Sequence, residues 1–177
     1  MVTTIVVLVL AAVFGAADQY LGSFSMHPWM ADVSLLSAPW LALPFFAGFA
    51  ARRPAHAALL GLACTFAALV GYGLMTLSPV EHAQLTTQSA AGFVRSSRNV
   101  FLGGLVTGPL FGWLGQQWRT RSAWWGGLAV AAALCLEPML RIAAGRPIGS
   151  SPVLLAEIAA GAATAASLAT SWRATMA

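Results

Sequence analysis

The feature that most constrains this chain is a set of apolar stretches long enough to cross a lipid bilayer. Residues 57–77, for example, contain no charged side chain. A helix needs about 20 apolar residues to span the hydrocarbon layer. Stretches of this kind lie near 3–22, 33–51, 56–77, 99–117, 123–142 and 152–172. We therefore expect an all-α integral membrane protein, a bundle of about six transmembrane helices that forms a single domain over residues 1–177.

The charge content supports a membrane protein and gives an orientation. Only 8% of the residues are charged, whereas about 25% is usual for a soluble domain. No basic soluble module is present, so we expect no nucleic-acid partner. Arginines at 52, 53, 119, 121 and 173 share one side of the predicted bundle, against those at 95, 98, 141 and 146 on the other. The positive-inside rule then predicts a multi-pass protein of the cell's inner (cytoplasmic) membrane, with both termini in the cytoplasm.

Small residues recur at helical spacing and predict close helix packing. Such ridges are formed by Ala12 and Ala16, by Gly104, Gly108 and Gly112, and by Gly161, Ala165 and Ala169. Small side chains let helix backbones approach one another in lipid, where the hydrophobic effect does not drive association. The ridges could equally serve a second copy of the chain or a partner helix.

Three acids lie within the predicted spans: Asp18, Glu137 and Glu157. An ionised group near the bilayer centre costs roughly 2.5–3.5 kcal/mol on insertion scales, so such residues are usually paired, inward-facing or functional. Glu137 and Arg141 are spaced for a helical ion pair, and Pro138 between them predicts a kink. A shared polar cavity would explain all three acids, although they could also be interfacial residues.

Aromatic residues accompany the acids in the same half of the predicted bundle. Tyr20, Trp29, Trp40, Tyr72 and Phe101 are the candidates for substrate binding, together with Arg98 and Arg141. Trp40 lies between Pro39 and Pro44, which should kink or unwind the helix, and we expect its ring to line a cavity. The polar segment 78–98 is the candidate for a lid or a mobile loop.

The residue types favour acid chemistry on an apolar substrate. No nucleophile elbow, phosphate loop, zinc site, redox centre or Asp-rich magnesium motif is present, so we expect no metal and no cofactor. A carboxyl group in an apolar pocket stays protonated near neutral pH and can act as a general acid. Aromatic faces stabilise a carbocation. These properties suit the cyclisation of a prenyl chain on a lipophilic substrate from the membrane, with Asp18 and Glu137 as the candidate catalytic acids.

A resemblance supports the same interpretation. The pattern runs from Trp40 through Arg52-Arg53-Pro54, Gly71-Tyr72, Gly104, Gly108-Pro109-Leu-Phe-Gly112 and Trp118-Arg119 to Glu137. It resembles a mostly uncharacterised family of small polytopic membrane proteins of high-GC bacteria, over roughly residues 28–140. More loosely, the chain is similar to the integral-membrane terpene cyclases of the drimentine type, which act on prenylated indole alkaloids. That resemblance implies a protonated acid that initiates cyclisation of a farnesyl group.

Two other functions remain open from the sequence. Short helices with both ends inside are similar to the substrate-binding subunits of energy-coupling-factor vitamin importers. In that case Ala12 and Ala16 would dock on the coupling subunit, and Arg95 and Arg98 would receive an anionic vitamin at a helix N-terminus. A third interpretation is a structural or accessory membrane protein in which Glu137 and Arg141 form only a packing lock.

Overall fold

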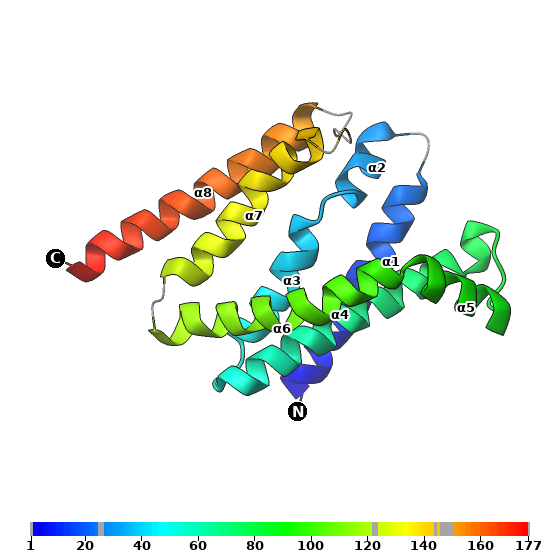
Figure 1. The fold of residues 1–177 in the computed structure, drawn as a ribbon, viewed down its shortest axis with the longest axis horizontal. Helices are drawn as coiled ribbons and strands as arrows, with labels where there is room; N and C mark the ends of the chain where they lie inside the picture. Colours follow the sequence, from blue (N-terminus) through cyan, green and yellow to red (C-terminus); the bar gives the residue numbers. More distant parts are fainter. Residues whose placement is uncertain (1, 25–26, 122–123, 144, 146–150, 177) are drawn as a thin grey trace.

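The computed structural model is all-helical (Figure 1). It describes residues 2–24, 27–121, 124–143, 145 and 151–176. Within these ranges eight α-helices and one 3₁₀ turn occur. They are α1 (Val2–Ser23), α2 (Pro28–Ser34), α3 (Ala38–Phe49), α4 (Pro54–Thr76), η1 (Pro79–Glu81), α5 (Thr87–Ser96), α6 (Arg98–Arg121), α7 (Trp124–Ala143) and α8 (Ser151–Met176).

Three of the described helices are long and apolar enough to cross a membrane: Thr3–Ser23, Pro54–Thr76 and Gly126–Ala143. They correspond to the predicted spans 3–22, 56–77 and 123–142. The predicted spans 33–51, 99–117 and 152–172 do not meet this criterion over the described residues. Ala38–Phe49 and Pro152–Ala166 are apolar but shorter. Helix α6 has the length, but glycines, two glutamines and terminal arginines lower its hydropathy.

The predicted helix 33–51 is wrong as one continuous element, because the chain breaks between α2 and α3. Helix α2 ends at Ser34, and α3 begins at Ala38 with Pro39 in its first turn. Proline suits the start of a helix because it has no N–H group to leave unpaired there. Helix α3 then continues through Pro44, so this second proline does not end it.

Glycines bring α1, α3, α4 and α6 into backbone contact. A Cβ atom added at Gly48 of α3 would collide with the carbonyl group of Gly112 in α6. One added at Gly71 of α4 would collide with the carbonyl group of Ala12 in α1. The predicted ridge of α6 faces α4, where Gly61 and Thr65 meet it. Thus Ala12 and the α6 ridge are used for packing inside the chain.

Helices α6 and α7 meet at their connected ends and diverge from there (Figure 1). At the meeting point a Cβ atom on Gly126 would lie 2.7 Å from the carbonyl oxygen of Leu114. Helix α8 packs along α7, where Gly161 faces Cys135 and Leu134. The divergence separates the α7–α8 pair from the N-terminal half of α6.

The segment 78–98, expected as a lid or mobile loop, contains regular structure. It begins with η1 and continues into α5, which Thr86 and Ser89 start with a reciprocal capping box. Such a cap satisfies two N–H groups that a helix start would leave unpaired. Helix α5 also places Phe93 against Gly73 of α4.

Candidate functional site

The first candidate site is built around Asp18. This side chain lies on α1 near its C-terminal end and is only 8% exposed. The indole nitrogen of Trp40 donates a hydrogen bond to its Oδ2 atom over 3.2 Å. The bond joins α1 to α3 and fixes the Oδ2 atom of the carboxyl group.

A connected set of aromatic rings extends from the Trp40 side chain that binds this carboxyl group. The ring of Trp40 meets Phe14 and Tyr72 edge to face, with centroids 5.5 and 5.9 Å apart. Tyr72 in turn stacks on Phe93 of α5 at 6.3 Å. Edge-to-face and offset pairs are the favourable arrangements of aromatic rings. The chain of rings therefore holds Trp40 and Tyr72 in defined positions beside Asp18.

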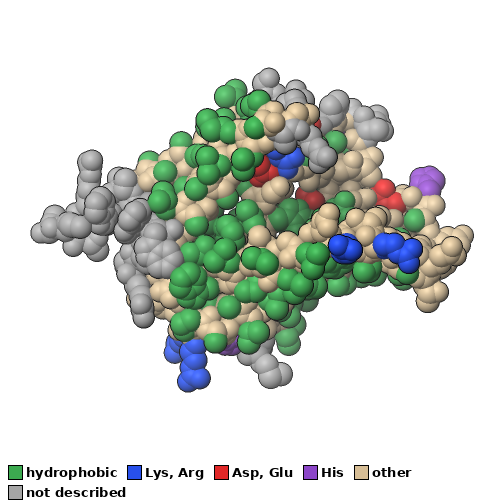
Figure 2. Space-filling model, viewed as in Figure 1, with side chains coloured by type: hydrophobic (Ala, Val, Ile, Leu, Met, Phe, Trp, Pro, Cys, Tyr) green, Lys and Arg blue, Asp and Glu red, His purple; other side chains and the backbone are tan. Residues whose placement is uncertain are grey.

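A cavity of about 420 Å³ lies beside these residues. Small-molecule sites commonly have roughly 300–1,000 Å³. Its walls come from helices α1 to α6 and from the break between α2 and α3. They include Asp18, Ser34, Leu35, Leu36, Ser37, Trp40, Leu41, Thr65, Leu69, Tyr72, Phe93, Ser97, Val100, Gly103, Gly104 and Thr107. We call it the Asp18 cavity. Figure 2 shows the surface hollowed between α7 and α6.

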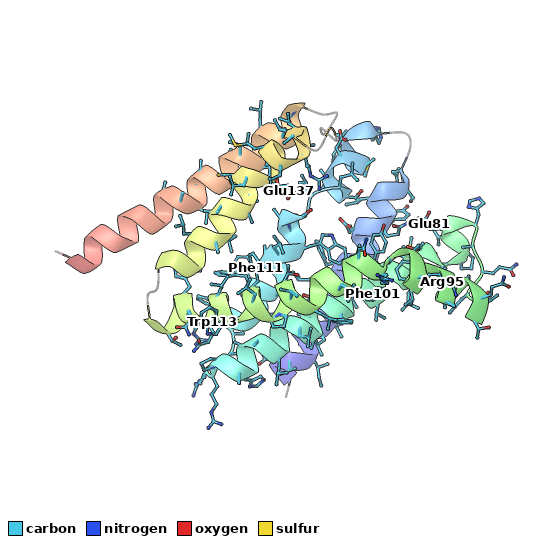
Figure 3. All side chains as sticks on the ribbon, viewed as in Figure 1. Glu81, Arg95, Phe101, Phe111, Trp113 and Glu137 are labelled. Atoms are coloured by element: carbon cyan, nitrogen blue, oxygen red, sulfur yellow. The ribbon has the colours of Figure 1, made fainter. Side chains whose placement is uncertain are left out.

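Glu137 has a different environment, at the break between α2 and α3 (Figure 3). Its carboxylate accepts the backbone N–H groups of Ser37 at 2.5 Å and Ala38 at 2.7 Å. Arg141 donates to Oε1 of the same carboxylate from Nε at 2.8 Å and from Nη2 at 2.6 Å. The guanidinium group also donates to the carbonyl oxygen of Leu35.

The ion pair therefore completes the hydrogen bonds of an interrupted helix. Helix termini carry unpaired N–H groups at the start and unpaired C=O groups at the end. The carboxylate of Glu137 covers the start of α3, and Arg141 covers Leu35 at the end of α2. Each charge also has the sign that the helix dipole favours at that end.

Glu157 of α8 also lies near the carboxyl group of Glu137. Its carboxyl group interacts with the carboxyl group of Glu137, as a hydrogen bond between the two acids, and with the charge on Arg141. Glu157 is 4% exposed, and neither of its oxygens accepts a hydrogen bond from an N–H or hydroxyl group of the described residues. A second cavity, of about 810 Å³, lies here. It is lined by Trp29, Val33, Leu36, Pro39, Leu134, Pro152, Val153, Ala156, Glu157 and Ala160. We call it the Glu157 cavity.

The structure divides the predicted site residues among several places. Asp18, Trp40 and Tyr72 line the Asp18 cavity, and Trp29 lines the Glu157 cavity. Glu137 and Arg141 are bound to each other and to the break, so neither of the two cavities found among the described residues has both Asp18 and Glu137 in its lining. The physical reason is that the broken backbone supplies donors that Glu137 accepts.

The remaining predicted residues lie outside both cavities. Tyr20 is 42% exposed and packs on Phe24. Phe101 contacts Phe93 and Phe66 behind the cavity wall. Arg98 begins α6 with an exposed side chain. None of these three lines the Asp18 cavity.

Phe93 was not among the predicted substrate-binding residues, and the hydroxyl groups of the wall were not predicted. The segment around Phe93 was expected as a loop, although its Thr86–Ser89 spacing is compatible with a capping box. Ser37, Thr65, Ser97 and Thr107 also line the cavity, and nothing in the local sequence marks them as neighbours.

Fold and site together define an all-helical protein with three described helices long and apolar enough to cross a membrane, and with a largely apolar cavity whose wall includes the carboxyl group of Asp18. Comparisons with protein-family models, curated proteins and solved structures give no match to this chain.

Proposed function

We propose that this protein is an integral-membrane terpene cyclase in which Asp18 protonates a prenyl chain of the farnesyl type. The observation that carries the proposal is the placement of a buried carboxyl group, held by Trp40, on the wall of an aromatic-lined cavity. The substrate would be a lipophilic molecule, such as a prenylated indole, that enters from the lipid. No metal, cofactor or diphosphate leaving group takes part.

The chemistry follows from the groups in the cavity. The Oδ1–H group of Asp18 transfers its proton to a terminal alkene carbon, which forms a C–H bond and leaves a tertiary carbocation. The next alkene attacks that cation, and a C–C bond closes the ring. The faces of Trp40 and Tyr72 stabilise the positive charge by up to about 2 kcal/mol each in a dry site. Loss of a proton from carbon to the Asp18 carboxylate restores the acid, so the product is an isomer of the substrate.

A deuterium experiment tests this mechanism. Purified protein in lipid nanodiscs is incubated with a farnesylated indole. The products are separated, and their masses are determined by mass spectrometry. The expected product has the mass of the substrate in H₂O and gains one deuterium in D₂O, because the acid's proton exchanges with solvent. Asp18→Asn should abolish this product, while Asp18→Glu should retain part of it. Asp32→Asn is the matched control, because Asp32 lines neither cavity.

Two results would overturn the proposal: no conversion of any prenylated substrate by the unaltered protein, or normal conversion by Asp18→Asn. A cyclised product without deuterium would also exclude protonation as the first step.

In this proposal the chain crosses the membrane six times, with both termini in the cytoplasm. Helices α1, α4, α6, α7 and α8 each supply one span, and α2 with α3 forms one interrupted span. The bonds from Glu137 and Arg141 support this interpretation, since they satisfy the interrupted backbone.

The second candidate is the substrate-binding subunit of a vitamin importer. It is favoured by Ser97, which lines the cavity at the start of α6, because a helix start attracts anions. The packing of Ala12 against Gly71 means that a coupling subunit would have to dock elsewhere. Such a subunit would copurify with an ATPase and return its ligand unchanged.

A further inference from the structure

The Glu157 cavity contains a buried acid that the proposed cyclase mechanism does not use. Glu157 is 4% exposed, and both of its carboxylate oxygens lack a donor among the described residues. The rest of the lining is apolar, with Trp29 on one wall and Leu134 and Val153 on others. A buried polar group normally has a hydrogen-bond partner, so the missing donor calls for an explanation.

The neighbouring charges do not supply that donor. Arg141 directs its guanidinium group to Glu137 and to Leu35 and Ser37 at the helix break. The carboxylate of Glu137 is occupied by two backbone N–H groups and by Arg141. Two carboxyl groups therefore share one guanidinium group, and the three side chains can accept one more positive charge beside Glu157. In the absence of a ligand a proton can provide it.

The cavity also restricts what else a ligand can be. Within the part of the chain that the structure describes, an anion would face the carboxyl groups of both Glu157 and Glu137, and the nearby Arg141 is already engaged at the helix break. A neutral hydrocarbon would fill the apolar walls but would leave the Glu157 oxygens unpaired, which is unfavourable in a dry site. An amphiphile with an apolar body and one ammonium group satisfies both parts. The indole ring of Trp29 adds an aromatic face of the kind that attracts cations.

We propose that the Glu157 cavity binds a lipophilic amine, whose ammonium group donates hydrogen bonds to the carboxylate of Glu157 while its alkyl chain lies among the apolar walls. This site is separate from the Asp18 cavity. The α2–α3 break lies between them, and Leu36 contributes to both linings.

Equilibrium binding of radiolabelled decylamine to the full-length protein in nanodiscs tests the site. Empty nanodiscs give the partition of the amine into lipid, which is subtracted. The expected result is saturable binding of one amine per chain, with no saturable binding of decanol. Glu157→Gln should weaken the affinity by at least about tenfold, because hydrogen bonds to charged groups are worth that much or more.

Two further variants keep the test interpretable. Asp18→Asn changes a buried acid of the other cavity and should leave decylamine affinity unchanged. Ala160→Phe keeps Glu157 but fills the cavity, and it should also reduce binding. The proposal is overturned if decylamine shows no saturable binding, if decanol binds equally well, or if Glu157→Gln binds as the unaltered protein does. Loss of cyclisation in Asp18→Asn with intact amine binding would show that the two sites are independent.

Discussion

Three buried acids of this chain differ in the donors that reach them. Glu137 accepts backbone N–H groups and a guanidinium group, Asp18 accepts one indole N–H group, and Glu157 accepts none from the described residues. The number of donors decides which acid is held as a carboxylate. Glu137 is therefore suited to holding structure, and Asp18 to exchanging a proton.

The first prediction concerns the stability contributed by Glu137. Glu137→Ala removes the acceptor for Ser37, Ala38 and Arg141 at once and leaves a charged group largely buried. Breaking a buried pair in this way destabilises proteins by roughly 3–5 kcal/mol. We expect a clear fall in the thermal unfolding temperature in detergent. Glu157→Gln is the control and should change stability little, because no donor is lost. Equal unfolding temperatures for Glu137→Ala and the unaltered protein would contradict the assigned role.

The second prediction separates the two functions of Trp40. Trp40→Phe keeps an aromatic ring beside Tyr72 but removes the N–H group that holds Asp18. Loss of one hydrogen bond to a charged or acidic group is worth about 1.5–3 kcal/mol, so we expect turnover of a prenylated substrate to fall at least about tenfold. The product mixture should stay the same because the wall is retained. Trp40→Ala removes both functions and should also change the mixture. Full turnover by Trp40→Phe would show that Asp18 does not need this bond.

The sequence predicted the buried acids better than it predicted the groups that form hydrogen bonds with them. An acid within an apolar stretch indicates an interior position, and the spacing of Glu137 and Arg141 predicted their ion pair, which is confirmed. The further contacts of that pair are with Leu35, Ser37 and Ala38, about a hundred positions earlier in the chain. Local spacing carries no information about such a distance, so the second role of Glu137 was not predictable.

At the scale of helices, the small-residue ridges were the most informative local signal. Gly104, Gly108 and Gly112 were predicted as a packing ridge, and all three face α4. Pro39 and Pro44 predicted a kink or unwinding around Trp40, but the break lies before both prolines, where Glu137 of another helix accepts the N–H group of Ser37. Three of the six predicted spans correspond to described helices that are long and apolar enough to cross a membrane, and the other three are shorter or less apolar.

A pair of alanine substitutions on α6 tests the ridge. A Cβ atom at residue 112 would come within 2.4 Å of the Ala57 carbonyl and force α6 away from α4.

 Gly112→Ala should therefore destabilise the protein by at least about 1–3 kcal/mol, as overpacking does in other cores. Gly103→Ala is the matched control on the same helix, because nothing lies within 4 Å of its added Cβ atom. It should be neutral or stabilise the helix by up to about 1 kcal/mol. Unfolding temperatures in detergent measure both, and equal effects of the two substitutions would contradict the close approach of α4 and α6.

Helix α5 is predicted to be held in place by Phe93. A Cβ atom at Gly73 would lie 2.7 Å from the Phe93 ring, so Gly73→Ala should displace the ring from its contact with α4. We expect faster hydrogen exchange of the α5 amides, because the helix has few other attachments to the bundle. Gly92→Ala, with nothing within 4 Å of the added atom, is the control and should leave exchange unchanged or slower. Unchanged exchange in Gly73→Ala would show that α5 is held by other contacts.

At the scale of the whole molecule, much of the outer surface is apolar, and exposed arginines lie at the helix ends. Large hydrophobic side chains such as Val13, Leu59, Val106 and Leu140 are more than half exposed, and Figure 2 shows such side chains over much of one face. At one end Arg119 donates to the carbonyl groups of Phe49 and Ala50, next to Arg52 and Arg53. The positive-inside rule predicts that this end faces the cytoplasm.

The last prediction tests the six-span arrangement by labelling single cysteines from either side of the membrane. Cys64 and Cys135 are first replaced by alanine, and a cysteine is then introduced at Arg53 or at Gln84, which are both exposed. With an odd number of crossings between them, these positions lie on opposite sides. In intact cells a membrane-impermeant maleimide should label Gln84→Cys. It should label Arg53→Cys only after the membrane is permeabilised. Labelling of both positions in intact cells would exclude α4 as a span, and the reverse pattern would place the termini outside.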